Sequence, residues 1–122
     1  MEAAKTHKGQ SAYLAGLAAE DQVVRHYVRQ GASLLETRWR GEGGEIDLIL
    51  QMADMLIFVE VKKSKTFERA VQMIRPAQLT RIMASAEEYA AQYGQAIDMR
   101  VDAALLDQQG KIEVIENITL DF

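Results

Sequence analysis

Three charged residues break two strongly apolar stretches of the sequence. Asp47 interrupts the first stretch, and Glu60 and Lys62 stand at the end of the second. Charge placed in an apolar strand is costly unless it is paired or binds a metal ion. Mg²⁺ prefers a few oxygen ligands and keeps several waters, and Asp47, Glu60 and the backbone carbonyl of Val61 could supply the protein's share. These residue types therefore predict a site for Mg²⁺ or Mn²⁺.

Strand geometry is expected to bring these side chains together. Side chains two apart in a strand point the same way, so Glu60 and Lys62 share a face, with Cα atoms roughly 6 to 7 Å apart. Two residues separate the apolar runs Ile46–Met52 and Met55–Val61, which is typical of an antiparallel hairpin. Asp47 then falls about opposite Glu60. Two carboxylates and one ammonium group converge at one end of the hairpin.

A metal ion held there could activate a water molecule and neutralise the charge that builds on a scissile phosphate. Lys62 would orient that water, help to deprotonate it, or stabilise the phosphate oxygens, and the sequence leaves these roles open. Glu20 follows Leu17 by three residues and precedes Val24 by four, so it lies in the apolar stripe of a helix. Glu20 is therefore a candidate for a further carboxylate at the metal.

Each of these residues also has an ordinary structural explanation. Glu60 and Lys62 could form an ion pair at the frayed end of an edge strand. Asp47 could be an acid beside a turn, and Glu20 could reach solvent at the border of its stripe. The coincidence of all four residues at compatible spacings favours a site over four independent accidents.

The apolar periods predict a single α/β domain over residues 1–122, with residues 1–10 as a flexible tail. The expected order is α-β-β-β-α-β-β, which gives a mixed β-sheet flanked by helices. The Gly-rich link Gly41–Gly44 is expected to be flexible, Ser64–Arg75 to be a loop or irregular helical stretch, and the state of Asn117–Phe122 is open.

The first helix carries an apolar stripe of Tyr13, Leu17, Val24, Tyr27 and Val28. The expected helices cover about Ser11–Gln30 and the stretch from Pro76 to Gly94, and the expected strands are Ser33–Arg40, Ile46–Met52, Met55–Val61, Met99–Leu106 and Ile112–Ile115.

Charge is segregated along the chain. The net charge is -4, yet the stretch from Lys62 to Arg81 holds six basic residues and one acid, while the chain from Glu87 onwards holds eight acids. A phosphate-binding face can therefore exist on an acidic protein, although a solvated surface would also account for the basic run. There is no cysteine and no run of membrane-spanning length, so we expect a cytoplasmic protein with no membrane partner.

Trp39 lies between Arg38 and Arg40. A tryptophan in such a setting can stack on a nucleic-acid base while the arginines hold phosphates. The favoured interpretation for Trp39 is the more ordinary one, in which the ring half-buries itself over the edge of the sheet.

Two motifs carry a family resemblance. Gly44–Ile49 and Phe58–Lys62 are similar to the YraN family of small bacterial proteins and, more widely, to the PD-(D/E)xK nuclease superfamily, whose motif is an Asp followed after a variable gap by Glu-x-Lys. The resemblance implies a restriction-endonuclease-like fold. It departs at Ser64, where relatives often have Arg, and at Arg38, where they often have Asn. By this resemblance the catalytic positions are Glu20, Asp47, Glu60 and Lys62, with Gln78 as an auxiliary polar group.

The expected function is metal-dependent hydrolysis of phosphodiester bonds in DNA, branched or single-stranded, with RNA less favoured. Related nucleases often cut both strands as dimers, so a homodimer is among the expectations. Two alternatives stay open: a nucleic-acid-binding module that is silent or needs a partner, and a protein-interaction domain. The residues expected to bind nucleic acid are Arg38, Trp39, Arg40, Lys63, Lys65, Arg75, Gln78 and Arg81.

Overall fold

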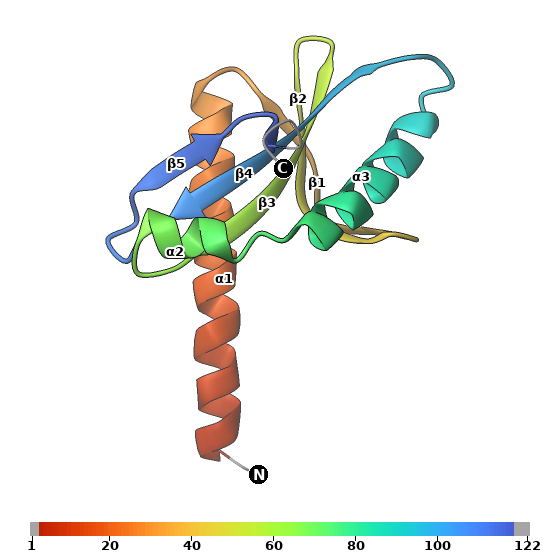
Figure 1. Cartoon of the computed structure of the whole chain (residues 1–122). Coiled ribbons are helices and arrows are strands. Elements are labelled where there is room, and N and C mark those ends of the chain that lie inside the picture. Colours follow the sequence, from red (N-terminus) through yellow and green to blue (C-terminus); the bar gives the residue numbers. More distant parts are fainter. Residues whose placement is uncertain (1–2, 119–122) are drawn as a thin grey trace.

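A five-stranded sheet in the order β1-β2-β3-β4-β5 forms the centre of the molecule (Figure 1). The computed structural model describes the backbone of residues 3–118 and the side chains of residues 14–118. Strands β3 and β4 run parallel and every other neighbouring pair runs antiparallel, so the sheet is mixed, as expected. The strands are β1 (Ser33–Gly41), β2 (Gly44–Met52), β3 (Met55–Lys63), β4 (Asp98–Leu106) and β5 (Ile112–Ile115).

Helices cover both faces of the sheet. Helix α1 (Ala3–Arg29) packs on one face, and α2 (Phe67–Gln72) and α3 (Pro76–Ala91) pack on the other. The order is thus α-β-β-β-α-α-β-β, because α2 forms inside the stretch Ser64–Arg75. Thr66 caps α2 by accepting a hydrogen bond from the Arg69 N–H, and six helical residues are too few to show a period in the sequence.

Helix α1 differs from its expected form in two ways: in the residue at which it begins and in which of its residues are buried. It begins at Ala3, so the expected tail of residues 1–10 is helical from its third residue, with residues 1–2 outside the described part. Its buried face consists of Ala19, Val23 and Tyr27 at a spacing of four. Val28, expected in the stripe, is 48% exposed, and the Tyr13 side chain lies outside the described residues. Figure 1 shows the first half of α1 projecting beyond the sheet.

The Gly-rich link is a tight turn and not a flexible segment. Gly41 pairs with Gly44 across the hairpin, and the Ser85 hydroxyl of α3 donates to the Gly44 carbonyl at 2.9 Å. A Cβ atom on Gly43 would lie 2.5 Å from the Arg81 carbonyl oxygen, which is closer than real Cβ atoms come. The hairpin can dock on α3 because this position carries no side chain.

Strand β1 forms an irregular edge of the sheet. The register between β1 and β2 shifts between Leu34 and Glu36, which marks a β-bulge at Leu35. Further along, Arg38 has φ 51°, a left-handed conformation that is uncommon for residues other than glycine. The bulge and the left-handed residue interrupt the regular strand at this edge.

The β2–β3 hairpin opens at one end. Its pairing runs from Met52 and Met55 at the turn to Leu48 and Val59, and β3 then continues to Lys63 beside β4. Extending the register by one residue sets Asp47 opposite Glu60, as the spacing predicted. The carboxylates therefore stand where β2 and β3 part and leave room between them.

A buried polar cluster fixes α1 to the sheet. The Asp102 side chain is fully buried in β4 and accepts hydrogen bonds from the Tyr27 hydroxyl at 2.7 Å and the Arg100 Nε at 2.8 Å. It also accepts from the backbone N–H of Asn117 at 3.0 Å. Burial, together with the Asp102 charge, raises the pKa of Tyr27, which keeps its proton as a donor. The last turns of α1 are thereby held in one rotation about the helix axis.

No helix within residues 3–118 has the length and apolarity needed to span a membrane.

Candidate functional site

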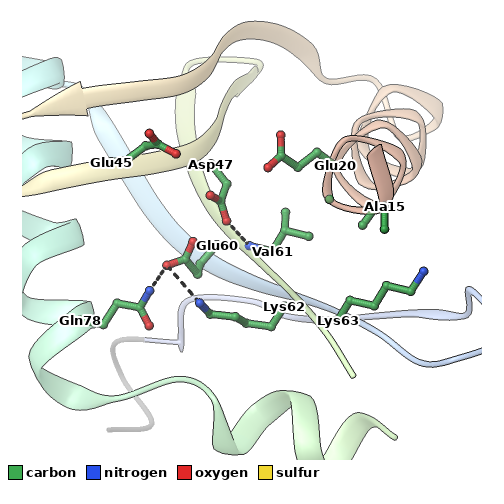
Figure 2. A pocket seen from close by; sticks show the side chains of 11 residues that line it. Ala15, Glu20, Glu45, Asp47, Glu60, Val61, Lys62, Lys63 and Gln78 are labelled. Carbon is green, nitrogen blue, oxygen red and sulfur yellow. Dashed lines mark hydrogen bonds and ion pairs between the residues drawn. The ribbon is translucent and has the colours of Figure 1, made fainter. Parts of the chain in front are cut away.

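A cavity of about 500 Å³ lies between α1, the parting ends of β2 and β3, and the first turn of α3 (Figure 2). It brings together four of the predicted residues, Glu20, Asp47, Glu60 and Lys62, from three different elements. The same cavity is lined by Glu45, Lys63 and Gln78. The convergence predicted from strand spacing is confirmed, and it places an acidic wall opposite basic and amide groups.

Asp47 is held by the backbone of the neighbouring strand. Its Oδ2 accepts a hydrogen bond from the Val61 N–H at 2.8 Å. Beyond Leu48 and Val59 the two strands no longer pair, so the Asp47 side chain takes the place of a strand partner for this N–H. Val61 thus enters the site through its N–H, and a role for its carbonyl as a ligand stays a prediction.

Glu60 is the buried acid of the cavity, with only 5% of its surface exposed. The Gln78 amide donates a hydrogen bond to its Oε2, and Lys62 Nζ lies 3.9 Å from the same oxygen (Figure 2). Burial, followed by hydrogen bonding with Asp47 and the charge of that residue, raises the pKa of Glu60 to about 9. Two carboxylates thus face each other in a poorly hydrated recess, and one of them keeps a proton at neutral pH.

This donor set fits a hydrated divalent cation. Two adjacent carboxylates repel each other when both are ionised. A divalent cation that takes the place of the proton between them neutralises this repulsion and stabilises the ionised pair. Mg²⁺ is usually bound by one or two carboxylates, with waters and substrate phosphates filling its shell. Among residues 14–118, no three acidic or histidine side chains come close enough to enclose an ion by themselves. Asp47 and Glu60 would therefore hold the ion, with an open coordination sphere.

Glu20 lines the cavity, but its carboxylate is engaged elsewhere. Arg38 Nε lies 3.1 Å from Glu20 Oε1, and Arg38 Nη2 donates to Oε2 at 3.3 Å. The pair links α1 to β1. Thr37 pairs with Leu48 and Trp39 with Ile46, so Arg38 lies beside Asp47 across these strands. In this arrangement Glu20 is a neighbour of the acidic pair and not a third partner in it.

The residues expected to bind nucleic acid separate into two groups. Arg40, Lys63, Lys65, Arg75 and Arg81 are exposed and reach solvent. The other members are committed to contacts within the protein: Arg38 pairs with Glu20, Gln78 bonds Glu60, and the Trp39 ring packs edge-on against Tyr89 at 5.2 Å. The favoured interpretation of Trp39, half-burial over the sheet edge, is confirmed.

Glu45 is the acid that the sequence analysis missed. It stands two residues before Asp47 on β2, so alternation along the strand puts both on one side, and its charge contributes to the raised pKa of Glu60. Arg40 Nη2 lies 3.9 Å from Glu45 Oε2 at the rim. The signal in the sequence is the i, i+2 spacing of two acids, Glu45 and Asp47, which is the same alternation that places Glu60 and Lys62 on one face.

The family assignment follows from sequence comparison. The pattern of the uncharacterised protein family UPF0102 matches residues 19–106, a range that contains Glu20, Asp47, Glu60 and Lys62. The chain belongs to the UPF0102 family. A UPF0102 protein of Roseobacter denitrificans is 49% identical over 116 residues, which cover 93% of this chain and 90% of the relative.

Two further UPF0102 relatives are similar along most of their length. The protein of Ruegeria pomeroyi is 46% identical over 112 residues, covering 90% of this chain and 91% of its own. That of Dinoroseobacter shibae is 43% identical over 119 residues, covering 96% of this chain and 89% of its own. The described fold is thus that of a UPF0102 protein spanning nearly the full length of its relatives.

Proposed function

We propose that this UPF0102 protein is a metal-dependent nuclease that hydrolyses phosphodiester bonds of DNA. The observation that carries the proposal is the meeting of Asp47, Glu60 and Lys62 in one cavity where β2 and β3 part. A mixed sheet with helices on both faces, and an Asp followed by Glu-x-Lys, support placing the chain with the YraN-like proteins in the restriction-endonuclease-like PD-(D/E)xK superfamily. Function is argued from the site, since one fold serves many activities.

Asp47 and Glu60 bind the cation. Hydrogen bonds from neighbouring groups hold both side chains in position. The Val61 N–H fixes the rotamer of Asp47, and the Gln78 amide fixes that of Glu60. When bound, Mg²⁺ or Mn²⁺ supplies a more acidic water and offsets the charge that develops on the phosphate. The cavity walls exclude bulk solvent from Glu60, which strengthens every charge interaction at this point.

Lys62 is the residue assigned to the reacting groups. Its ammonium lies 3.9 Å from Glu60 Oε2, and its side chain is 19% exposed. That contact keeps the long side chain directed into the cavity and not into solvent. From there Lys62 donates to a phosphate oxygen or to the attacking water, so it stabilises charge that exists only in the transition state.

Metal binding is the first test, with thermal stability as the readout. At ten times its dissociation constant, Mg²⁺ should stabilise the fold by about 1.4 kcal/mol through mass action. Asp47→Asn keeps an acceptor for the Val61 N–H but removes the charge, and it should abolish the shift. Asp54→Asn is the matched control, because Asp54 is exposed at the opposite end of the same hairpin. Equal shifts in both variants would contradict the metal site.

Cleavage is the second test. Single-stranded, duplex, flapped and four-way DNA, together with RNA, should be incubated with Mg²⁺ or Mn²⁺ and with EDTA. Products that require the metal and disappear in Asp47→Asn are expected for at least one DNA substrate. Salt-dependent binding without any product would instead indicate a silent or partner-dependent nucleic-acid-binding module on this fold.

A further inference from the structure

A second concave surface adjoins the candidate metal site. It has a volume of about 450 Å³ and is lined by Lys63, Ser64, Lys65 and Gln108. Lys63 lines both this hollow and the acidic cavity, so the two adjoin at this residue. Figure 2 shows Lys62 reaching towards Glu60 and Lys63 extending away from it, which carries positive charge out of the cavity.

Backbone contacts fix the shape of this hollow. The Ser64 N–H donates to the Leu106 carbonyl at 3.0 Å, and the Gln108 N–H donates to the Lys65 carbonyl at 3.4 Å. The loop after β3 is thus held against the turn between β4 and β5. Because the walls are tied on both sides, the two lysines project from a defined framework.

The charged side chains that line the hollow are both lysines. Lys63 and Lys65 are exposed, and neither forms an ion pair with any residue in the described part of the chain. Asp107 is the nearby acid, but its Oδ1 accepts from the N–H groups of Gln109 and Lys111, both at 2.9 Å. Two ammonium groups beside a hydroxyl and an amide form a surface suited to a phosphate.

We propose that Lys63, Ser64, Lys65 and Gln108 bind the backbone phosphate of the nucleotide adjacent to the scissile one. The proposal rests on the nuclease function, which places one phosphate beside Asp47 and Glu60. With one phosphate beside Asp47 and Glu60 and the next phosphate in this hollow, the substrate is a polynucleotide strand. These groups contact the backbone only, and the subsite therefore reads no base sequence.

Binding of a short single-stranded DNA in EDTA tests the subsite without any catalysis. Fluorescence anisotropy at several salt concentrations should compare the protein with Lys63→Gln/Lys65→Gln. Losing the contact with this one phosphate should make the slope of log K against log salt shallower by about 0.7, which is about 5-fold in affinity at 0.1 M salt. Arg25→Gln/Arg29→Gln removes the same charge from exposed positions near the end of α1 and should leave binding unchanged.

Three results would overturn the subsite: no binding by the unmodified protein, an unchanged slope in the lysine variant, or an equal loss in the arginine control. Failure of the subsite can be distinguished from failure of the nuclease proposal. Weakened strand binding in the lysine variant, with no cleavage under any metal condition, would keep the subsite and reject the chemistry. Metal-dependent cleavage, with unaltered strand binding in the lysine variant, would keep the nuclease function and reject the subsite.

Discussion

Replacing Glu60 with glutamine should stabilise the metal-free protein. The pKa of Glu60 is raised from 4.5 to about 9, so at pH 7 the folded state must keep a proton that the unfolded chain releases. The pH interval between 4.5 and 7 corresponds to about 3 kcal/mol of lost stability. Glutamine removes this cost and keeps an oxygen to accept from Gln78. Because Asp47 shares part of the cost, we expect a gain of roughly 1 to 3 kcal/mol in Glu60→Gln.

Thermal unfolding in EDTA from pH 5 to pH 8 measures this gain. The folded state binds more protons than the unfolded chain between pH 4.5 and pH 9, so this contribution to stability falls as the pH rises. The difference between Glu60→Gln and the unmodified protein should therefore widen with pH and vanish near pH 4.5. For a domain of this size each kcal/mol corresponds to roughly 4 °C in Tm.

A control variant and the effect of Mg²⁺ on Tm provide two further tests of the comparison between Glu60→Gln and the unmodified protein. Glu113→Gln makes the same chemical change at an exposed position on β5 and should leave Tm unchanged. Mg²⁺ should raise the Tm of the unmodified protein increasingly with pH, because binding displaces the proton, and should leave Glu60→Gln unmoved. A Glu60→Gln variant that is no more stable than the unmodified protein at pH 8 in EDTA would refute the picture of two buried, opposed carboxylates.

Three other substitutions separate the roles of individual groups. Lys62→Ala should keep the metal-induced rise in Tm but lower the cleavage rate by about a hundredfold or more, and unchanged cleavage would remove its assigned role. Arg38→Gln should release the Glu20 carboxylate, so Mn²⁺ titrated by calorimetry should bind up to about tenfold more tightly, a gain lost when Glu20→Gln is added. Tyr27→Phe removes one of the donors to Asp102 and should cost about 1 to 2 kcal/mol in denaturant unfolding while sparing the metal response; a lost metal response would tie that cluster to the site.

The hairpin and its acids could be predicted because they depend on local pattern. Alternation places Glu60 and Lys62 on one face, and a two-residue turn fixes which residue of β2 meets Glu60. Neither inference needs knowledge of the rest of the molecule. The mixed sheet likewise follows from adjacent strands bounded by helices.

Contacts between elements distant in sequence could not be predicted in the same way. Whether Glu20 faces Asp47 or Arg38 depends on the rotation of α1 and on the left-handed backbone at Arg38. The buried face of α1 was misjudged because it includes Ala19 and Val23, while Val28, the same residue type as Val23, is 48% exposed. Residue type does not tell which of two valines faces the sheet, because that depends on the rotation of the helix about its axis.

The irregular edge at β1 limits how copies of this chain can associate. A straight, unpaired edge invites a second chain to continue the hydrogen-bonding ladder, which leads to open-ended stacking. The bulge at Leu35 and the left-handed backbone at Arg38 break the regular row of donors and acceptors that such stacking needs. At the opposite edge β5 offers only the four residues Ile112–Ile115. Copies of this chain that associate should therefore meet through side chains, and the folded protein should stay dispersed at high concentration.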